Sequence, residues 1–278
     1  MNYYCLIAGL PDLVEDTKST IRISELKSEL FEQLSMADWQ LLSLIFASYD
    51  NENLIAYLAN KEAELNPLGN LNATDWNELL TLISETESPR DPRLNPYIIN
   101  FVQTIGVENG LPEGVSKTDF LTSLYYAEAI GHSNDFVSKW YAYNLNLNNV
   151  LTAIISRKHG YNLQNAVIGD NEIANNLRQS QAKDFGLTNL FADFELIHKI
   201  SDEPDLMERE KKIDALKWNW LDDATFFHYF SIEKVIAYVL KLQLMERWQM
   251  LTIEKGREVF RHMLNQLKKE VDTETTNS

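Results

Sequence analysis

Apolar residues recur every three or four positions along most of this chain. In the first such stretch, Leu26, Leu30, Phe31 and Leu34 mark one face, and Ser24 is placed to cap it. This spacing is that of one side of an α-helix, whereas a half-buried strand would alternate apolar and polar residues. The stretch therefore predicts a helix whose apolar face carries these four side chains.

The same periodicity predicts helices along the rest of the chain. We expect them at residues 39–47, 50–57, 75–83, 96–105, from 116 or 118 to 130, 134–143, 147–158, 171–179 and 189–200. Pro204 opens a further helix with Leu206, Ile213, Leu216 and Trp220 on its apolar face. A last helix is expected over 231–271, with a break near Gly256.

Start and stop signals support this assignment. Ser35 with Asp38 resembles a capping box, Asn95-Pro96 is typical of a helix start, and Gly160 suits a C-terminal cap. Thr74 is placed to cap the helix at 75–83. All seven prolines fall at predicted boundaries, where they avoid the ~3 kcal/mol that an interior proline costs. Residues 3–10 are the exception, interpreted as a short strand or a buried extended arm. The predicted fold class is all-α.

Composition and charge narrow the class of partner. The 278 residues include 45% hydrophobic ones, enough for a core, and the net charge is −16. Residues 1–90 hold 15 acidic and 5 basic side chains, so 5 − 15 = −10 of that charge lies in the first third. Such a charge repels nucleic acid and anionic lipid, and it either keeps the protein soluble or meets a basic protein surface. With one cysteine, no basic leader and the longest apolar run at 41–47, a cytoplasmic location is expected.

Few residue patterns here point to chemistry. Glu195 and His198 have the spacing that places two metal ligands on one helix face, but a di-metal helical site needs two such pairs and two further glutamates. Cys5 lies in an apolar segment, where a thiol is expected to be buried and inert. We predict no catalytic residue, no cofactor site and no metal site.

Aromatic residues concentrate near the C-terminal end. They form either a core that joins the last two helices or a contact patch, because tryptophan and tyrosine are enriched at interface anchors. The residues concerned are Trp218, Trp220, Phe226, Phe227, Tyr229 and Phe230.

Two apolar stretches carry a family resemblance. One runs from Asn149 through Val150 to Gly160, and the other from Tyr238 through Leu240 to Arg247. Together they resemble the central-stalk family of V-type and A-type rotary ATPases that is designated C, or d in eukaryotes. A weaker trace follows Asn53-Leu54, and the opening residues 3–13 look like a bacterial branch whose genes tend to lie among those for a V/A-type ATPase.

This chain departs from the family pattern at two places. Ile155 stands where the first stretch usually has arginine, with Arg157 following it. Met245 stands where the second usually has an acidic residue, with Glu246 beside it.

The resemblance implies a fold and a job. The fold would be a funnel-like array of three similar helical lobes, at about 1–90, 91–203 and 204–271, with a polar tail at 272–278. The protein would be a non-catalytic coupling subunit that links the rotary shaft to the proteolipid ring, peripheral to the inner face of the membrane, and transmits torque during ion transport. A free-standing helical adaptor and a helical metal-dependent enzyme around Glu195 and His198 are the alternatives.

Overall fold

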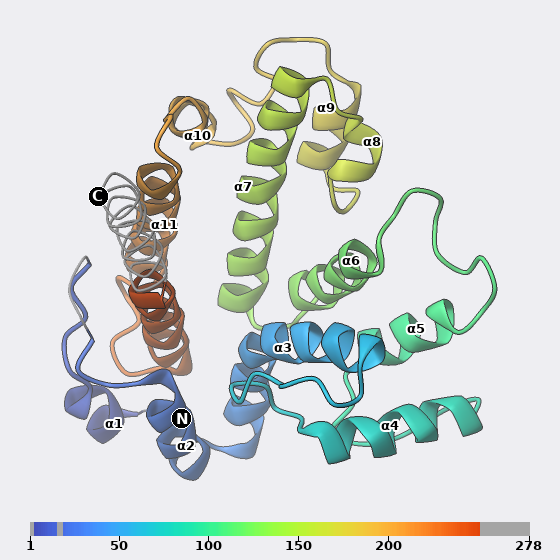
Figure 1. Cartoon of the computed structure of the whole chain (residues 1–278). Coiled ribbons are helices and arrows are strands. Elements are labelled where there is room, and N and C mark those ends of the chain that lie inside the picture. The colour runs from blue at the N-terminus through green and yellow to red at the C-terminus, as the bar shows by residue number, and fades with distance from the viewer. Residues whose placement is uncertain (1–2, 16–18, 251–278) are drawn as a thin grey trace, which may run out of the picture. The chain divides into compact units, whose positions relative to one another are not determined.

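Every regular element in the part of the chain that the structure describes is an α-helix (Figure 1). This computed structural model describes residues 3–15 and 19–250. The all-α prediction is therefore confirmed for them. The described residues divide into two compact units, one drawn from residues 3–15 and 19–33 with 230–250 and the other from residues 34–229. The division into three lobes stays a prediction.

The unit of residues 34–229 is organised around its longest helix. That helix, α7 (Asp135–His159), contacts α6, α8, α9, α10 and α11, whereas α3 contacts α4 and α6 (Figure 1). The other elements are α3 (Met36–Ala59), α4 (Ala73–Glu85), α5 (Pro96–Ile105), α6 (Lys117–Ile130), α8 (Leu163–Ala166), α9 (Glu172–Gln179), α10 (Phe194–Ser201) and α11 (Leu206–Ala224).

The core of this unit follows the apolar face of α7. Leu147, Val150 and Ala153 are fully buried on that helix, at the 3.6-residue period of one face. Side chains from α9, α10 and the connecting segments cover this face. They are Val167, Ala174, Leu177, Phe185, Leu187, Phe191, Phe194, Ile197 and Ile200, with Ile213 from α11.

Most of the expected caps are present. Ser35 accepts the Asp38 N–H, Ser116 accepts the Asp119 N–H, and Pro96 is the first residue of α5. Gly160 ends α7 in the left-handed conformation at φ 72°, as its position predicted. Two caps were wrong. The helix α4 is capped by Asn72, not by Thr74, because Asn72 and Asp75 form a reciprocal capping box. Ser24 lies inside α2, which begins at Ile23, and does not cap it.

Two predicted breaks do not exist. Residues 39–47 and 50–57 belong to the single helix α3, and residues 134–143 and 147–158 belong to the single helix α7. Polar residues at both junctions interrupt the apolar stripe, and this interruption resembles a helix end in the sequence. Asp50 and Asn144 are instead buried inside the helices with hydrogen-bonding partners.

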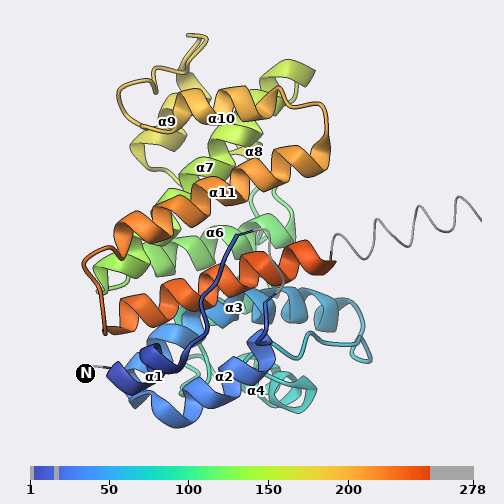
Figure 2. The same ribbon diagram turned by 90° about the vertical axis from the view of Figure 1, so that its left-hand side faces the viewer.

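The second unit holds α1 (Tyr4–Gly9), α2 (Ile23–Gln33) and a helix described over residues 232–250. In Figure 2, α1 and α2 lie along one side of that helix. The Tyr3 N–H donates to the Phe230 carbonyl oxygen at 2.7 Å, and the Tyr238 hydroxyl donates to the Pro11 carbonyl oxygen at 2.9 Å. The expected break near Gly256 lies outside the described residues.

The N-terminal segment and two apolar faces depart from the predictions. Residues 3–10 form neither a strand nor an extended arm, because a lone strand has no neighbour here to pair its backbone groups, whereas the helix α1 pairs them internally. Phe31 and Leu206 are 60% and 59% exposed, so neither belongs to a buried face. The helix expected from residue 189 begins at Phe194, since successive turns occupy the preceding residues.

Within the described residues, none of the helices combines the length and the apolar character that a membrane span requires.

Candidate functional site

Asn149 begins the first of the two stretches that carry the family resemblance. It lies on the buried face of α7, and its side chain binds the segment that follows this helix. Its Nδ2 donates to the Ile168 carbonyl oxygen at 2.8 Å, and its Oδ1 accepts the Ile168 N–H at 2.9 Å. Asn149 is 3% exposed, so both hydrogen bonds are shielded from water. One amide side chain thus satisfies both backbone groups of a residue in the loop between α8 and α9.

Asn53 makes the same pair of contacts on α3. Its Nδ2 donates to the Asn66 carbonyl oxygen at 3.0 Å, and its Oδ1 accepts the Asn66 N–H at 2.7 Å. Asn53 is 2% exposed. We call Asn53 and Asn149 the asparagine clamps, and the hairpins they close are α3–α4 and α7–α9.

A second polar residue lies three positions before each clamp, on the same helix face. Asp50 accepts the Asn70 and Leu71 N–H groups at 2.7 and 3.0 Å, and the Asn70 Nδ2 at 2.6 Å. Asn146 accepts the Asn171 Nδ2 at 2.9 Å. Asp50 thus binds the segment just before the cap of α4, and Asn146 binds the cap residue of α9.

The loop of the first hairpin runs so close to α3 that only glycine fits at one point. A Cβ atom added to Gly69 would lie 2.5 Å from Asn53 Nδ2 and 2.9 Å from Asp50 Oδ1. Those two side chains are held by hydrogen bonds to the loop backbone, so moving either of them aside would disturb those bonds. Gly69 is therefore required by close approach rather than by an unusual φ angle.

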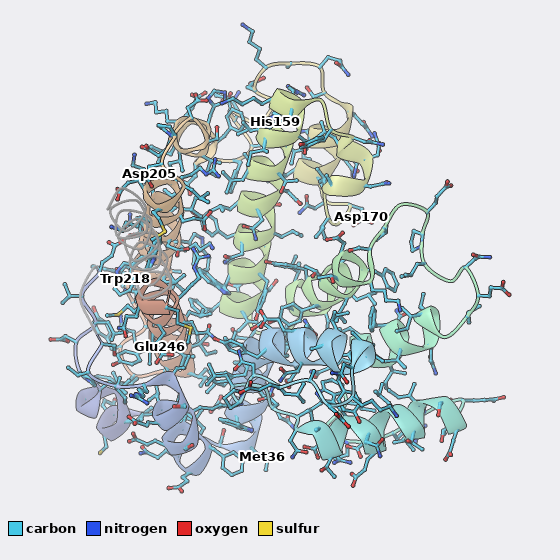
Figure 3. The ribbon with its side chains drawn as sticks, in the orientation of Figure 1. Met36, His159, Asp170, Asp205, Trp218 and Glu246 are labelled. Carbon is cyan, nitrogen blue, oxygen red and sulfur yellow. The ribbon has the colours of Figure 1, made fainter. Side chains whose placement is uncertain are left out.

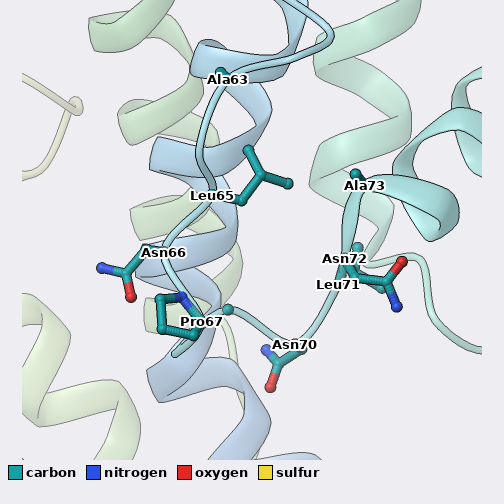
Figure 4. Close-up of a pocket in the computed structure, with 9 residues that line it drawn as sticks. Ala63, Leu65, Asn66, Pro67, Asn70, Leu71, Asn72 and Ala73 are labelled. Carbon is teal, nitrogen blue, oxygen red and sulfur yellow. The ribbon is translucent and has the colours of Figure 1, made fainter.

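This loop also lines a surface hollow of about 310 Å³, bounded by residues 63–73 (Figure 4). The asparagines around it serve the protein itself. Asn66 Oδ1 accepts the Leu68 N–H, Asn70 Nδ2 donates to Ser43 and Asp50, and Asn72 Oδ1 caps α4. The geometry explains the hollow as the inside of a clamped loop, with its polar groups directed at the chain.

The other residues of the first stretch support the same hairpin. The Arg157 guanidinium donates to the Ala182 and Ser180 carbonyl oxygens at 2.6 and 2.8 Å and lies 3.4 Å from the Phe185 ring centroid. Arg157 thus binds the segment that leaves α9, while Gly160 turns the chain at the end of α7. Ile155, which stands where the resemblance would place an arginine, is half-buried.

The second stretch lies in the other unit, on the helix at 232–250. Leu240 is buried and Arg247 is exposed, with its guanidinium 5.7 Å from the Trp248 ring centroid. Burial, and then the nearby Asp12 carboxylate, raise the pKa of Tyr238 to about 12. Its hydroxyl holds the chain after α1 through Pro11.

Met245 stands where the resemblance would place an acidic residue, and Glu246 is next to it. Met245 is buried at 5% exposure, whereas the Glu246 carboxylate accepts the Ile23 N–H at 2.6 Å. Ile23 is the first residue of α2, so Glu246, labelled in Figure 3, satisfies one of the free N–H groups of that helix end. A carboxylate also interacts favourably with the positive end of the helix dipole.

Buried tyrosines join four helices at the base of α7. The Tyr125 hydroxyl donates to the Leu44 carbonyl oxygen at 2.8 Å and lies 2.5 Å from the Tyr141 hydroxyl. Tyr97, on α5, packs its ring on Tyr125 at 5.6 Å and donates to Asn51 Oδ1. Burial raises the pKa of Tyr97, Tyr125 and Tyr141 well above the usual value of a tyrosine.

The predicted metal pair is not part of a ligand cluster. Glu195 and His198 are both exposed on α10, and the His198 ring packs on Phe194. Among residues 3–15 and 19–250, no three histidine, cysteine or acidic side chains are grouped to hold a metal ion. Cys5 is exposed rather than buried, because α1 turns it away from the face that buries Leu6.

The C-terminal aromatic group separates into a buried and an exposed part. Trp218, labelled in Figure 3, is 8% exposed, and the Trp220 ring lies against Phe136, Trp140 and Tyr143. These two tryptophans belong to a core, but the printed ring contacts of Trp220 are with α7, so a core that joins the last two helices stays a prediction for them. The core interpretation is wrong for the remaining aromatics. Phe226, Phe227, Tyr229 and Phe230 are 65%, 81%, 64% and 37% exposed.

The fold and these contacts define an all-α protein whose polar clamps hold helical hairpins together. The chain belongs to the family described as "Protein of unknown function (DUF2764)", whose model matches residues 1–271. No curated protein and no solved structure matches it.

Proposed function

We propose that this protein is a non-catalytic coupling subunit of a V/A-type rotary ATPase, which links the rotary shaft to the proteolipid ring and transmits torque. The observation that carries the proposal is the asparagine clamp. Asn149 belongs to the stretch that resembles the central-stalk family of these ATPases, and Asn53 to its weaker trace. Both make the same two hydrogen bonds.

The repeated clamp supports an array of similar lobes. Asn53 and Asn149 fall in the first two of the three expected lobes, one in each. In both hairpins a long helix is followed by a loop that returns along its buried polar face. A funnel assembled from such lobes would place equivalent surfaces around a central opening, which suits a socket for a shaft.

Torque transmission requires a subunit that resists twisting. Loops are ordinarily the most mobile segments of a fold. Here each clamped loop is fixed to its helix by buried hydrogen bonds, and a close-packed interior deforms little. The clamps therefore stiffen the connections at which a stack of helices would otherwise yield.

An acidic helix face offers a contact for the shaft. Glu25, Glu29 and Glu32 are exposed on α2, and they contribute to the acidic first third of the chain. A shaft tip rich in lysine and arginine would associate faster with such a face, and the attraction would weaken with salt.

The direct test is affinity capture of the tagged protein from its native membranes in mild detergent, with mass spectrometry of the bound proteins. The proposal expects the shaft subunits and the proteolipid together. Recovery of one unrelated soluble partner, with both ATPase components absent, would contradict it and favour the free-standing adaptor.

A charge-reversal pair sharpens this test. Glu25→Lys, Glu29→Lys and Glu32→Lys combined should reduce capture of the shaft and remove its salt dependence. The matched control reverses Glu87, Glu108 and Glu113, which are also exposed and change the net charge equally. Equal capture by the two variants would count against α2 as the shaft contact.

A further inference from the structure

The hollow inside the α3–α4 loop is preformed. Asn53 fixes one of its sides through both backbone groups of Asn66. Asp50 fixes the other side through the N–H groups of Asn70 and Leu71. Each side is thus tied to the buried face of α3. A ligand that enters the hollow would not have to order the loop first, and this removes one of the main costs of binding.

The size and the apolar part of the lining limit what can enter. The volume of about 310 Å³ is at the lower end of the ~300–1,000 Å³ that ligand pockets span. The apolar residues of the lining are Ala63, Leu65, Pro67, Leu71 and Ala73. In Figure 4 the Leu65 side chain points toward the side that carries Ala73. Such a space accepts one aliphatic side chain with its peptide group rather than a large cofactor.

The polar part of the lining consists of three asparagines whose amides are only half used. Asn66 and Asn72 accept backbone N–H groups through Oδ1, and Asn70 donates through Nδ2. Among the described residues, no hydrogen bond uses Nδ2 of Asn66 or Asn72, or Oδ1 of Asn70. The hollow therefore offers donors and an acceptor, which are the partners that the backbone of an extended peptide needs.

Acidic residues outnumber basic ones beside the hollow. The charged residues are Lys61, Glu62 and Glu64 next to its first side, and Asp75 with its network of Glu78, Asp91 and Arg93 next to its second. Two cations and five carboxylates give 2 − 5 = −3. Glu62 and Glu64 are exposed and have no ion pair within the described part of the chain. A lysine or arginine next to the entering side chain would find these carboxylates available.

We propose that the hollow binds an extended segment of a partner protein in which an aliphatic side chain is flanked by lysine or arginine residues. The aliphatic side chain packs against Leu65 and Ala73, and the half-used asparagine amides bind the peptide groups on either side of it. The flanking cations face Glu62 and Glu64. An anionic bilayer is disfavoured because these carboxylates repel its headgroups.

This inference goes beyond the proposed function and does not depend on it. A basic segment of this kind on the rotary shaft would satisfy both proposals. The peptide preference of the hollow is measured on the purified chain, whereas the coupling role is measured by capture from membranes. Either proposal can therefore fail while the other stands.

A peptide selection on the purified full chain tests the site. Random nine-residue peptides displayed on phage are selected on the unaltered chain and, in parallel, on Ala73→Trp, in which an indole ring occupies the hollow. Peptides retained by the first chain and not by the second should share one leucine, isoleucine, valine or methionine. At least two lysines or arginines should lie within three positions of that residue.

Matched variants separate the hollow from its surroundings. Binding of the most enriched peptide, followed by fluorescence anisotropy, should weaken about tenfold in Ala73→Trp and in Leu65→Ser, because each removes the burial of an aliphatic side chain. Thr74→Trp adds the same ring at the neighbouring exposed position, which is not part of the lining, and should leave binding unchanged. Urea unfolding checks that each variant folds, and Leu65→Ser tests the site independently of the inserted ring.

Charge variants test the flanking cations. Glu62→Gln with Glu64→Gln should weaken binding of the same peptide about fivefold at low salt and much less at high salt. The matched control is Glu85→Gln with Glu87→Gln, which changes the net charge equally at the other end of α4 and should have no effect.

Four outcomes would overturn the proposal. They are a selection without a shared sequence, a shared sequence without basic residues, equal peptide binding by the unaltered chain and both hollow variants, and equal losses in the two charge variants. Sedimentation of the unaltered chain covers a further occupant. Self-association that Ala73→Trp abolishes would assign the hollow to a second copy of this chain instead.

Discussion

The α3–α4 and α7–α9 hairpins form the same asparagine-to-loop contact although their sequences differ. In each, a buried asparagine late in a long helix takes both backbone groups of one loop residue. Three residues earlier the hairpins differ, because α3 uses the acidic Asp50 and α7 the neutral Asn146. Asp50 receives three hydrogen bonds from two consecutive loop residues, whereas Asn146 receives one from a helix cap.

The difference shows which of the two polar positions is constrained by the hydrogen-bonding needs of the loop backbone. A loop that passes along a buried helix face must have its backbone groups satisfied, and an asparagine supplies a donor and an acceptor together. The upstream position needs only an acceptor. It therefore varies with the number of N–H groups that the loop directs toward it.

The largest loss of stability is expected when the carboxylate of Asp50 is removed. Asp50→Ala leaves the Asn70 and Leu71 N–H groups buried without their acceptor, and should cost roughly 3–5 kcal/mol in the free energy of unfolding measured with urea. Asp50→Asn reproduces the α7 arrangement and should cost less than half as much. Equal losses in the two variants would mean that the carboxylate charge, rather than an acceptor, is what the loop requires.

The two clamps should respond alike. Asn53→Ala and Asn149→Ala each leave one buried N–H and one buried carbonyl group unpaired, and each should cost about 2–3 kcal/mol in urea unfolding. A large loss in one variant beside a negligible loss in the other would break the equivalence of the hairpins.

Close approach should matter more than backbone strain at the two glycines of the comparison. Gly69→Ala forces a Cβ against Asn53 and Asp50 and should cost about 1–3 kcal/mol. Gly160→Ala meets no atom within 4 Å and is destabilised only by its positive φ, by about 1 kcal/mol. Thermal unfolding of both variants measures the order, and the reverse order would contradict the close approach.

The buried tyrosines are expected to have the smallest effect on stability at neutral pH, because their contribution changes only in alkaline solution. The folded-state pKa of Tyr97, Tyr125 and Tyr141 is raised, so their contribution is complete below the unfolded pKa of about 10 and is lost as pH rises above it. Each should then lower the free energy of unfolding by up to about 1.4 kcal/mol per pH unit. Tyr141→Phe should reduce the slope of the unfolding free energy against alkaline pH by the contribution of one titrating group. An unchanged slope would contradict a neutral buried Tyr141.

The sequence predicted the helices more reliably than their boundaries. Caps with a local mechanism, such as Ser35, Ser116 and Gly160, were correctly placed because their partners lie within a few residues. The junctions inside α3 and α7 were missed because Asp50 and Asn146, the polar residues there, pair with segments 20 and 25 positions further along the chain. Asn53 bonds to a residue 13 positions away and Asn149 to one 19 away, and periodicity carries no information about such partners.

The candidate sites were predicted unevenly for the same reason. Asn149 and Gly160 were singled out through the resemblance, and the trace at Asn53 marked the second clamp. Asp50 was predicted only to start a helix. An acidic residue within an apolar helical stretch, followed by an asparagine-rich loop, is a sequence signal for a buried carboxylate that binds the loop. The exposure of Phe226 and Phe227 depends on the turn at Thr225, which apolar composition alone does not reveal.

Amide hydrogen exchange at Asn66 and Ile168 tests the central claim most directly, since these are the N–H groups that the two clamps accept. Both lie in loops, where unprotected amides exchange quickly. The account predicts strong protection at both residues, with Asn53→Ala abolishing it at Asn66 alone and Asn149→Ala at Ile168 alone. Rapid exchange at either residue in the unaltered protein would contradict a single hairpin design used twice.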